Sequence, residues 1–320
     1  MKRNRSNSAS TPVLPRHLWA VLLAGGDGVR LRGLTERIVG DQRPKQFCPI
    51  VSGQSLFRET RGRLDPLFSG DRQAFVVSRA HEKYYNDELI DAKDSIVIAQ
   101  PANRGTAVGI IAALVQIMQV DPDAIVGIFP CDHYYSDEAA FRSIVRSATW
   151  IAERFREFIV IVGAGAEYAE TEYGWIEPAQ LLAQSGATPL YRVKQFWEKP
   201  ALPQARALLH RGCLWNTFVT IGAAATFLDL VCTEVPEVVL SMTRAQADNE
   251  LTSVYARLPS VDFSRDILAN QANRLLVLRD SCSGWADLGS PDRVLGLLAK
   301  SGNQPAWFRQ THCLRPEVIQ

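Results

Sequence analysis

The chain has 320 residues, of which 47% are hydrophobic and 22% are charged, and this composition is ordinary for a globular protein with a sizeable core. Its formal net charge is +1, and basic residues gather only in the first few positions, so neither a nucleic-acid-binding arm nor an acidic tail is indicated. No stretch approaches the ~20 apolar residues that a membrane span needs. We therefore expect a cytoplasmic protein that binds neither nucleic acid nor a membrane.

The first predicted segment is a tail. Residues 1–16 are basic and rich in Ser, Asn and Pro, and the apolar run that follows is short and ends in glycines instead of a cleavage site. We expect a disordered tail that precedes a buried strand. Six cysteines are scattered along the chain without a CxxC pair, which is typical of thiols in a reducing compartment and predicts no metal site among them.

Short apolar runs rich in β-branched residues then alternate with longer helical segments. We predict strands over 19–24, 74–78, 95–99, 124–129 and 157–163, and helices over 106–119 and 137–155. Strands that alternate with helices favour an α/β protein, with a mostly parallel sheet covered by helices on both faces.

The pattern is looser after residue 165. We expect strands over 173–178 and 191–200 that end at prolines, a short helix over 203–212 that ends at a glycine, and a strand that turns into a helix over 214–231. No internal repeat or Pro/Gly/Ser-rich linker is visible. The prediction is one domain over 17–300, followed by a C-terminal extension over 301–320.

Glycines directly follow the first predicted strand, at positions 25, 26 and 28. Without Cβ atoms the backbone can approach a ligand, and its N–H groups can face an anion, so the loop is predicted to bind phosphate. The dinucleotide-binding fingerprint fails because Leu31 stands at its third glycine, and the P-loop pattern fails because Leu34 stands where its lysine belongs.

A third pattern fits this region. The sequence Gly25-Gly26-x-Gly28-x-Arg30-Leu31, followed by Arg43-Pro44-Lys45-Gln46-Phe47, resembles the signature of sugar-1-phosphate nucleotidyltransferases, most closely the mannose-1-phosphate guanylyltransferases. Val29 replaces the Thr or Ser that is usual there, which removes a hydroxyl group. The resemblance implies that Gly25, Gly26 and Gly28 bind the nucleotide. It also implies that Arg30 and Lys45 neutralise the triphosphate and the leaving pyrophosphate.

Two acidic segments extend the resemblance: Pro130-Cys131-Asp132-His133 and Trp285-Ala286-Asp287-Leu288-Gly289. Taken alone, Asp132 is compatible with a helix cap and Asp287 with a turn before a glycine. The resemblance implies instead that both carboxylates bind Mg²⁺, which prefers oxygen ligands and bridges protein to phosphate. The implied catalytic residues are Arg30, Lys45, Asp132 and Asp287.

Four further segments resemble the parts of that family that recognise the base and the sugar. Residues 100–110 resemble the base-binding segment and imply nucleotide contacts by Asn103, Arg104, Gly105 and Thr106, although Thr106 is equally compatible with a helix cap. The segments 173–178, 196–200 and 214–219 imply sugar-phosphate contacts by Gly174, Glu198, Lys199 and Asn216. Phe218 stands where glycine is common, and a Glu-Lys pair usual after Asp262 is missing.

The resemblance implies a Rossmann-like nucleotidyltransferase (GT-A-like) α/β fold with a mostly parallel mixed sheet. It implies transfer of a nucleotidyl group from an NTP, with GTP as first choice, to a hexose 1-phosphate, with mannose 1-phosphate as first choice. The products would be GDP-mannose and pyrophosphate, and Mg²⁺ the cofactor. Two alternatives stay open: another NDP-sugar pyrophosphorylase, and a catalytically silent paralogue that binds an NDP-sugar. A homodimer also stays open.

Overall fold

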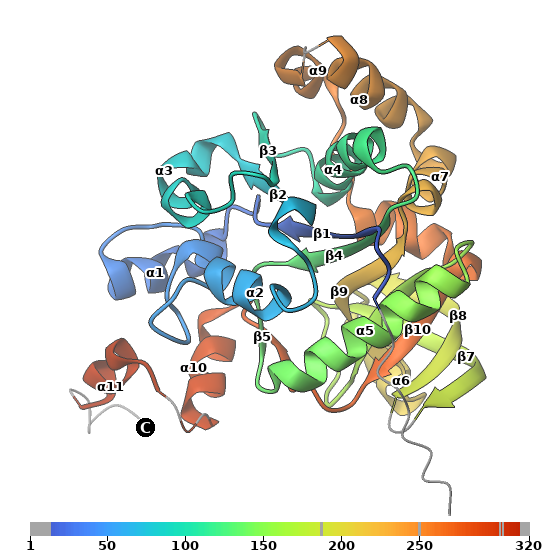
Figure 1. The fold of residues 1–320 in the computed structure, drawn as a ribbon. Coiled ribbons are helices and arrows are strands. Elements are labelled where there is room, and N and C mark those ends of the chain that lie inside the picture. Colours follow the sequence, from blue (N-terminus) through green and yellow to red (C-terminus); the bar gives the residue numbers. More distant parts are fainter. Residues whose placement is uncertain (1–13, 186–187, 249–250, 301, 303, 314–320) are drawn as a thin grey trace, which may run out of the picture.

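A computed structural model describes residues 14–185, 188–248, 251–300, 302 and 304–313. Within them, a central sheet has nine strands in the order β3-β2-β1-β4-β9-β6-β10-β8-β7 (Figure 1). The bounds of its strands are β1 Leu18–Leu23, β2 Gln73–Ser78, β3 Ile96–Gln100, β4 Ile125–Pro130, β6 Ile159–Gly165, β7 Gly174–Ser185, β8 Thr188–Glu198, β9 Leu214–Ala223 and β10 Leu275–Asp280. Only β8 and β9 run against the others in this described sheet, which confirms the mostly parallel mixed architecture.

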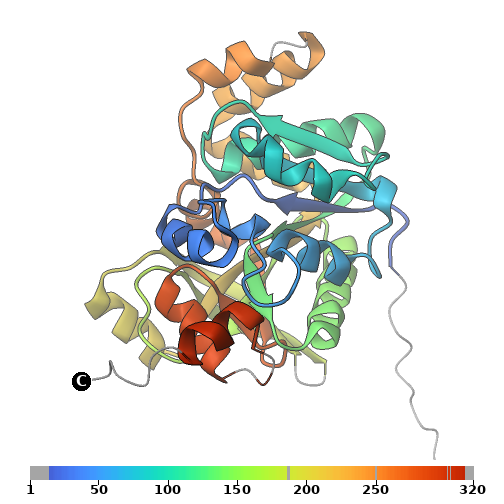
Figure 2. The same ribbon diagram turned by 90° about the vertical axis from the view of Figure 1, so that its left-hand side faces the viewer.

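Helices cover both faces of this sheet (Figure 1; Figure 2). The bounds are α1 Arg32–Val39, α2 Leu56–Leu64, α3 Glu82–Tyr85, α4 Thr106–Val120, α5 Glu138–Arg154, α6 Leu202–His210, α7 Ala224–Glu234, α8 Pro236–Asp248, α9 Leu251–Arg257, α10 Pro291–Lys300 and α11 Ala306–Cys313. One hydrophobic core contains residues of α4, α7 and α8, and a second contains residues of α2 and α5. Each core lies between a sheet face and its helices.

Strand β1 shows why the apolar runs predicted strands so well. Trp19 and Val21 belong to the first core, while Leu18, Ala20 and Leu22 belong to the second. Alternate side chains of a strand point to opposite faces, and both faces are buried here, so the whole run must be apolar.

One predicted boundary is wrong. We expected the strand that starts near residue 173 to end at Pro178, but β7 continues to Ser185. The register between β7 and β8 shifts between Glu177 and Pro178, which accommodates the proline. Proline is tolerated on an edge strand or at a bulge, where its missing N–H breaks no ladder bond, and β7 is the last strand in the sheet order.

The last helices pack behind the glycine loop. Leu31 and Leu34 share a hydrophobic cluster with Val294 and Leu298 of α10 and with Phe308 of α11. Residues 1–13 of the expected tail lie outside the described residues, as do 314–320 of the expected extension. Of the helices in the described ranges, none has the length and apolar character to cross a membrane.

Candidate active site

All the predicted site residues except Arg104 line two adjoining cavities at the carboxyl ends of the parallel strands. In open α/β sheets this edge is where ligands bind. The larger cavity has a volume of about 430 Å³ and the smaller one about 250 Å³. The predicted residues that line the larger cavity are Gly25, Gly26, Arg30, Asn103, Gly105, Thr106, Asp132, Gly174, Glu198, Lys199, Asn216 and Asp287. Gly28 and Lys45 line the smaller cavity, which also borders Arg30 and Asp132.

The glycines of the loop serve different purposes. Gly28 has a φ of +58°, and a Cβ there would lie 2.9 Å from the backbone N of Lys45. A Cβ on Gly25 would lie 2.8 Å from the amide of Gln100, whereas a Cβ on Gly26 would have no heavy atom within 4 Å. Gln46, a motif residue to which the sequence analysis gave no role, donates from its amide to the carbonyls of Ala24 and Gly26 at 2.8 and 2.7 Å. The Gln46 hydrogen bonds thus fix the shape of the loop, and no other described part of the protein fills the space next to Gly26.

The two acids converge on one cation. The Lys45 Nζ lies 3.2 Å from the Asp132 Oδ2 and 3.6 Å from the Asp287 Oδ1, and it donates to the Leu288 carbonyl at 3.1 Å. Burial raises the pKa of Asp132, but the Lys45 charge, the nearby His133 and hydrogen bonds together outweigh burial and hold the pKa of that carboxyl below its ordinary value. The site therefore holds two carboxylates and a buried ammonium in direct electrostatic contact.

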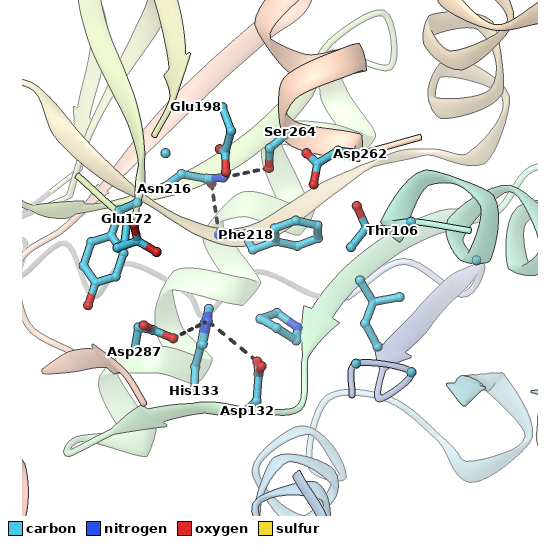
Figure 3. A pocket seen from close by; sticks show the side chains of 18 of the residues that line it. Thr106, Asp132, His133, Glu172, Glu198, Asn216, Phe218, Asp262, Ser264 and Asp287 are labelled. Atoms are coloured by element: carbon cyan, nitrogen blue, oxygen red, sulfur yellow. Dashed lines mark hydrogen bonds and ion pairs between the residues drawn. The ribbon is translucent and has the colours of Figure 1, made fainter. Parts of the chain in front are cut away.

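A small second sheet explains how residues so far apart in sequence meet. Strand β5 (His133–Tyr135) pairs antiparallel with β11 (Trp285–Asp287), and Asp287 lies opposite His133. Figure 3 shows His133 between Asp132 and Asp287, and its Nε2 is 3.7 Å from an oxygen of each. The Trp285 indole donates to the His133 Nδ1 at 3.1 Å. Burial lowers the pKa of His133 despite the nearby carboxylates, and its neutral form then carries the proton on Nε2, facing them.

Two arginine side chains form ion pairs at the rim of the site, and the sequence analysis did not identify one of them, Arg293. The Arg293 guanidinium donates to the Asp287 Oδ2 and to Glu170 Oε2, both at 2.6 Å, and lies 4.5 Å from the centre of the Tyr173 ring. Asp287 thus keeps its other oxygen for the pocket. Arg30, which was predicted, pairs with Glu172 at 3.0 Å in an exposed contact. The sequence carries no local signal for the contacts of these arginines with Glu170 and Glu172, because the partners are more than a hundred residues apart.

The predicted sugar-binding residues gather at one end of the larger cavity. A Cβ on Gly174 would lie 2.8 Å from Glu198 Oε2 and 3.1 Å from the Asn216 Cβ, so glycine allows these two side chains to approach. Burial, and then the neighbouring charge of Asp262, raise the pKa of Glu198 to about 7. The Asn216 Oδ1 accepts from the Phe218 N–H at 3.0 Å. Asn216 therefore presents its NH₂ group as a donor (Figure 3).

The predicted base-binding segment divides into residues that face the cavity and residues that support it. Arg104 lies outside both cavities, and its guanidinium donates to the carbonyls of Tyr255 and Ala256. Gly105 has a φ of +82° and packs against the Val261 carbonyl. The alternative that Thr106 caps the helix is wrong: Gly105 is the N-cap of α4, and the Thr106 hydroxyl accepts from the backbone of Phe263 at 2.8 Å.

Comparison with known proteins gives one consistent result. A family model for nucleotidyl transferases matches residues 19–302. The alginate biosynthesis protein AlgA of Pseudomonas putida is 30% identical over 285 residues, which are 84% of this chain and 56% of that protein. Mannose-1-phosphate guanylyltransferase of Sinorhizobium fredii is 27% identical over 307 residues, which are 90% of this chain and 56% of that protein. The chain thus spans little more than half the length of these curated relatives.

Solved structures show the same likeness. The mannose-1-phosphate geranyltransferase structure from Thermus thermophilus is 30% identical, with a TM-score of 0.73, over 85% of this chain and 76% of that one. A UDP-glucose pyrophosphorylase structure complexed with UDP-glucose has a TM-score of 0.56 at 17% identity, which is a likeness of fold alone.

Proposed function

Because this chain belongs to the nucleotidyl transferase family, we propose that it transfers a nucleotidyl group from an NTP to a hexose 1-phosphate and releases pyrophosphate. The observation that carries the proposal is the convergence of Asp132 and Asp287 on the Lys45 ammonium beside the glycine loop. GTP and mannose 1-phosphate are the proposed substrates. This choice is supported by relatives named mannose-1-phosphate guanylyltransferase and by the sequence motifs.

The donor atoms of the site suit Mg²⁺. Asp132 and Asp287 provide hard carboxylate oxygens that already share one cationic partner, Lys45. Across the described part of the chain, no group of three or more His, Cys, Asp or Glu side chains could hold a metal ion. Mg²⁺ is often bound by only one or two carboxylates together with substrate phosphates, so two acids suffice. Bound between Asp132 and Asp287, Mg²⁺ would neutralise charge on the reacting phosphates.

The remaining residues position the reactants. The backbone of residues 25–28 receives the triphosphate, and Arg30 and Lys45 bring positive charge to the pyrophosphate that leaves. Lys199 holds the sugar phosphate, Asn216 donates to the hexose and Glu198 accepts from its hydroxyls. The attacking phosphate oxygen is already ionised at neutral pH, so the reaction needs no general base. In-line alignment and charge neutralisation then supply the rate enhancement.

A substrate panel tests this proposal. The protein is incubated with Mg²⁺, each of the common NTPs and each of several hexose 1-phosphates, and pyrophosphate release is followed. Turnover with GTP and mannose 1-phosphate alone supports the full proposal. Turnover with another pair identifies a different NDP-sugar pyrophosphorylase and overturns the substrate choice. Binding of an NDP-sugar without turnover of any pair overturns the enzymatic proposal and favours the silent paralogue.

A further inference from the structure

Phe218 has a backbone conformation that phenylalanine rarely adopts. Its φ is +64°, in the left-handed region, where a residue with a Cβ is strained and a bulky one more so. Among the described residues, Lys199 is the only other non-glycine residue with a positive φ. Both residues line the larger cavity. Backbone strain of this kind persists where surrounding structure enforces it, and it concentrates at functional sites.

The surrounding structure holds Phe218 in a bulge of β9. Ile161 pairs with Thr220 and Gly163 with Asn216, so residues 217–219 of β9 face the single residue 162 of β6. The Thr217 hydroxyl donates to the Val162 carbonyl at 2.8 Å and accepts from the Val219 N–H at 3.3 Å. The Phe218 N–H donates to Asn216 Oδ1 at 3.0 Å. These side-chain hydrogen bonds replace the backbone hydrogen bonds between β6 and β9 that the bulge interrupts, and they fix the direction of the Phe218 side chain.

The bulge aims the ring into the pocket. Figure 3 shows the Phe218 ring extending from the side of Asn216 toward Thr106, across the space that the cavity residues surround. The Phe263 ring, which is fully buried, supports it with centroids 6.1 Å apart. A hexose held by Asn216 and Glu198 therefore meets an apolar ring face on one side.

We propose that Phe218 is a specificity-determining residue that restricts the hexose end of the pocket to sugars without an acylamino substituent. The inference rests on the proposed function, because it assigns the substrate class of that same site. The apolar ring can pack on the C–H face of a pyranose. It cannot pair the N–H and C=O of an acetamido group, and burying those groups unpaired is unfavourable. The fixed bulge prevents the backbone from moving the ring aside.

Two variants distinguish the effect of the Phe218 ring from the effect of the backbone strain. Phe218→Ala and Phe218→Gly both remove the ring, but only glycine relieves the left-handed strain. Mannose 1-phosphate and N-acetylmannosamine 1-phosphate form a ligand pair that differs only at C2, where an acetamido group replaces the hydroxyl. The wild-type preference for the unsubstituted sugar, as a ratio of kcat/KM, is expected to fall at least about tenfold in both variants. The Tm of Phe218→Gly is expected to lie about 2 to 4 °C above that of Phe218→Ala.

A matched control and a binding readout complete the experiment. Phe155→Ala removes an aromatic side chain that is 40% exposed at the end of α5, and it should leave the ratio unchanged. The dissociation constants of both sugar phosphates are measured by calorimetry alongside turnover. If wild type turns over no substrate pair, the proposed function fails, and the ratio of dissociation constants still decides the role of Phe218. Ratios of kcat/KM or of dissociation constants that stay at the wild-type value in both folded variants overturn the inference.

Discussion

Replacing Arg293 with methionine should weaken both the fold and the site. Arg293, Asp287 and Glu170 have side chains only 19%, 14% and 12% exposed, and the arginine contacts both acids at 2.6 Å. Removing one partner of a buried ion pair costs about 3 to 5 kcal/mol, and the nearby Lys45 ammonium places the expected loss near the lower end, at about 3 kcal/mol. With an unfolding entropy of about 2.1 cal/mol/K per residue over roughly 300 residues, Tm should fall by about 5 °C.

The assay combines thermal unfolding with pyrophosphate release. Arg142→Met is the matched control, because Arg142 pairs with Glu138 on the surface of α5, with 27% and 45% exposure, and such a pair contributes less than about 1 kcal/mol. In Arg293→Met the turnover number should also fall, since Asp287 can then rotate away from the pocket. Adding Glu170→Gln removes one unpaired charge and should recover part of the lost Tm. If Arg293→Met melts within about 1 °C of Arg142→Met, the arginine does not hold these acids together as the geometry indicates.

Three further predictions follow from the site. Asp132→Asn should lower kcat at least about 100-fold while circular dichroism shows an intact fold, and near-normal turnover would remove Asp132 from the mechanism. Glu198 ionises with a pKa of about 7, so calorimetry should show GDP-mannose binding about fivefold tighter at pH 8 than at about pH 6. In Glu198→Gln that pH dependence should vanish, and its persistence would assign it to another group. Gly105→Ala should lower the free energy of unfolding by about 2 to 4 kcal/mol in urea titrations. Alanine is strained at the positive φ of this position, and its Cβ would clash with the Val261 carbonyl. The control Gly33→Ala, at an open helical position, should leave the free energy of unfolding unchanged or raise it by up to about 1 kcal/mol. If Gly105→Ala and Gly33→Ala changed the free energy of unfolding equally, the steric argument for Gly105 would be wrong.

The fold could be predicted because its strands are buried on both faces. A strand such as β4 must be apolar throughout, whereas a helix such as α5 buries only one face, so the hydrophobic pattern distinguishes these two elements. The family and the α/β architecture are confirmed. Pro178 was misjudged because its effect depends on the position of β7 at the edge of the sheet, which no local pattern records.

The site could be predicted only in part, for a similar reason. Its glycines and acids occupy motifs with fixed local spacing, and the structure brings them together, although their roles stay predictions. Arg293 acquires its importance from a loop more than a hundred residues away, at Glu170. The left-handed conformation of Phe218 depends on a bulge against β6. The motif spacing shows that Phe218 stands where glycine is common, but it could not predict the direction in which the ring points.

The packing of α10 behind the glycine loop has a consequence for synthesis of the protein. The Lys45 ammonium donates to the carbonyl of Leu288, 243 residues later, and the cluster that contains Leu31 and Val294 joins the same two regions. A nascent chain on the ribosome that has been made as far as β10 contains the glycine loop but neither the second acid nor the helix that supports it. Contacts of such long range form late in folding. If the chain binds a nucleotide as proposed, the full stabilisation by that nucleotide requires α10 to be made and packed, so ligand-dependent resistance to proteolysis would report on the folding of this region.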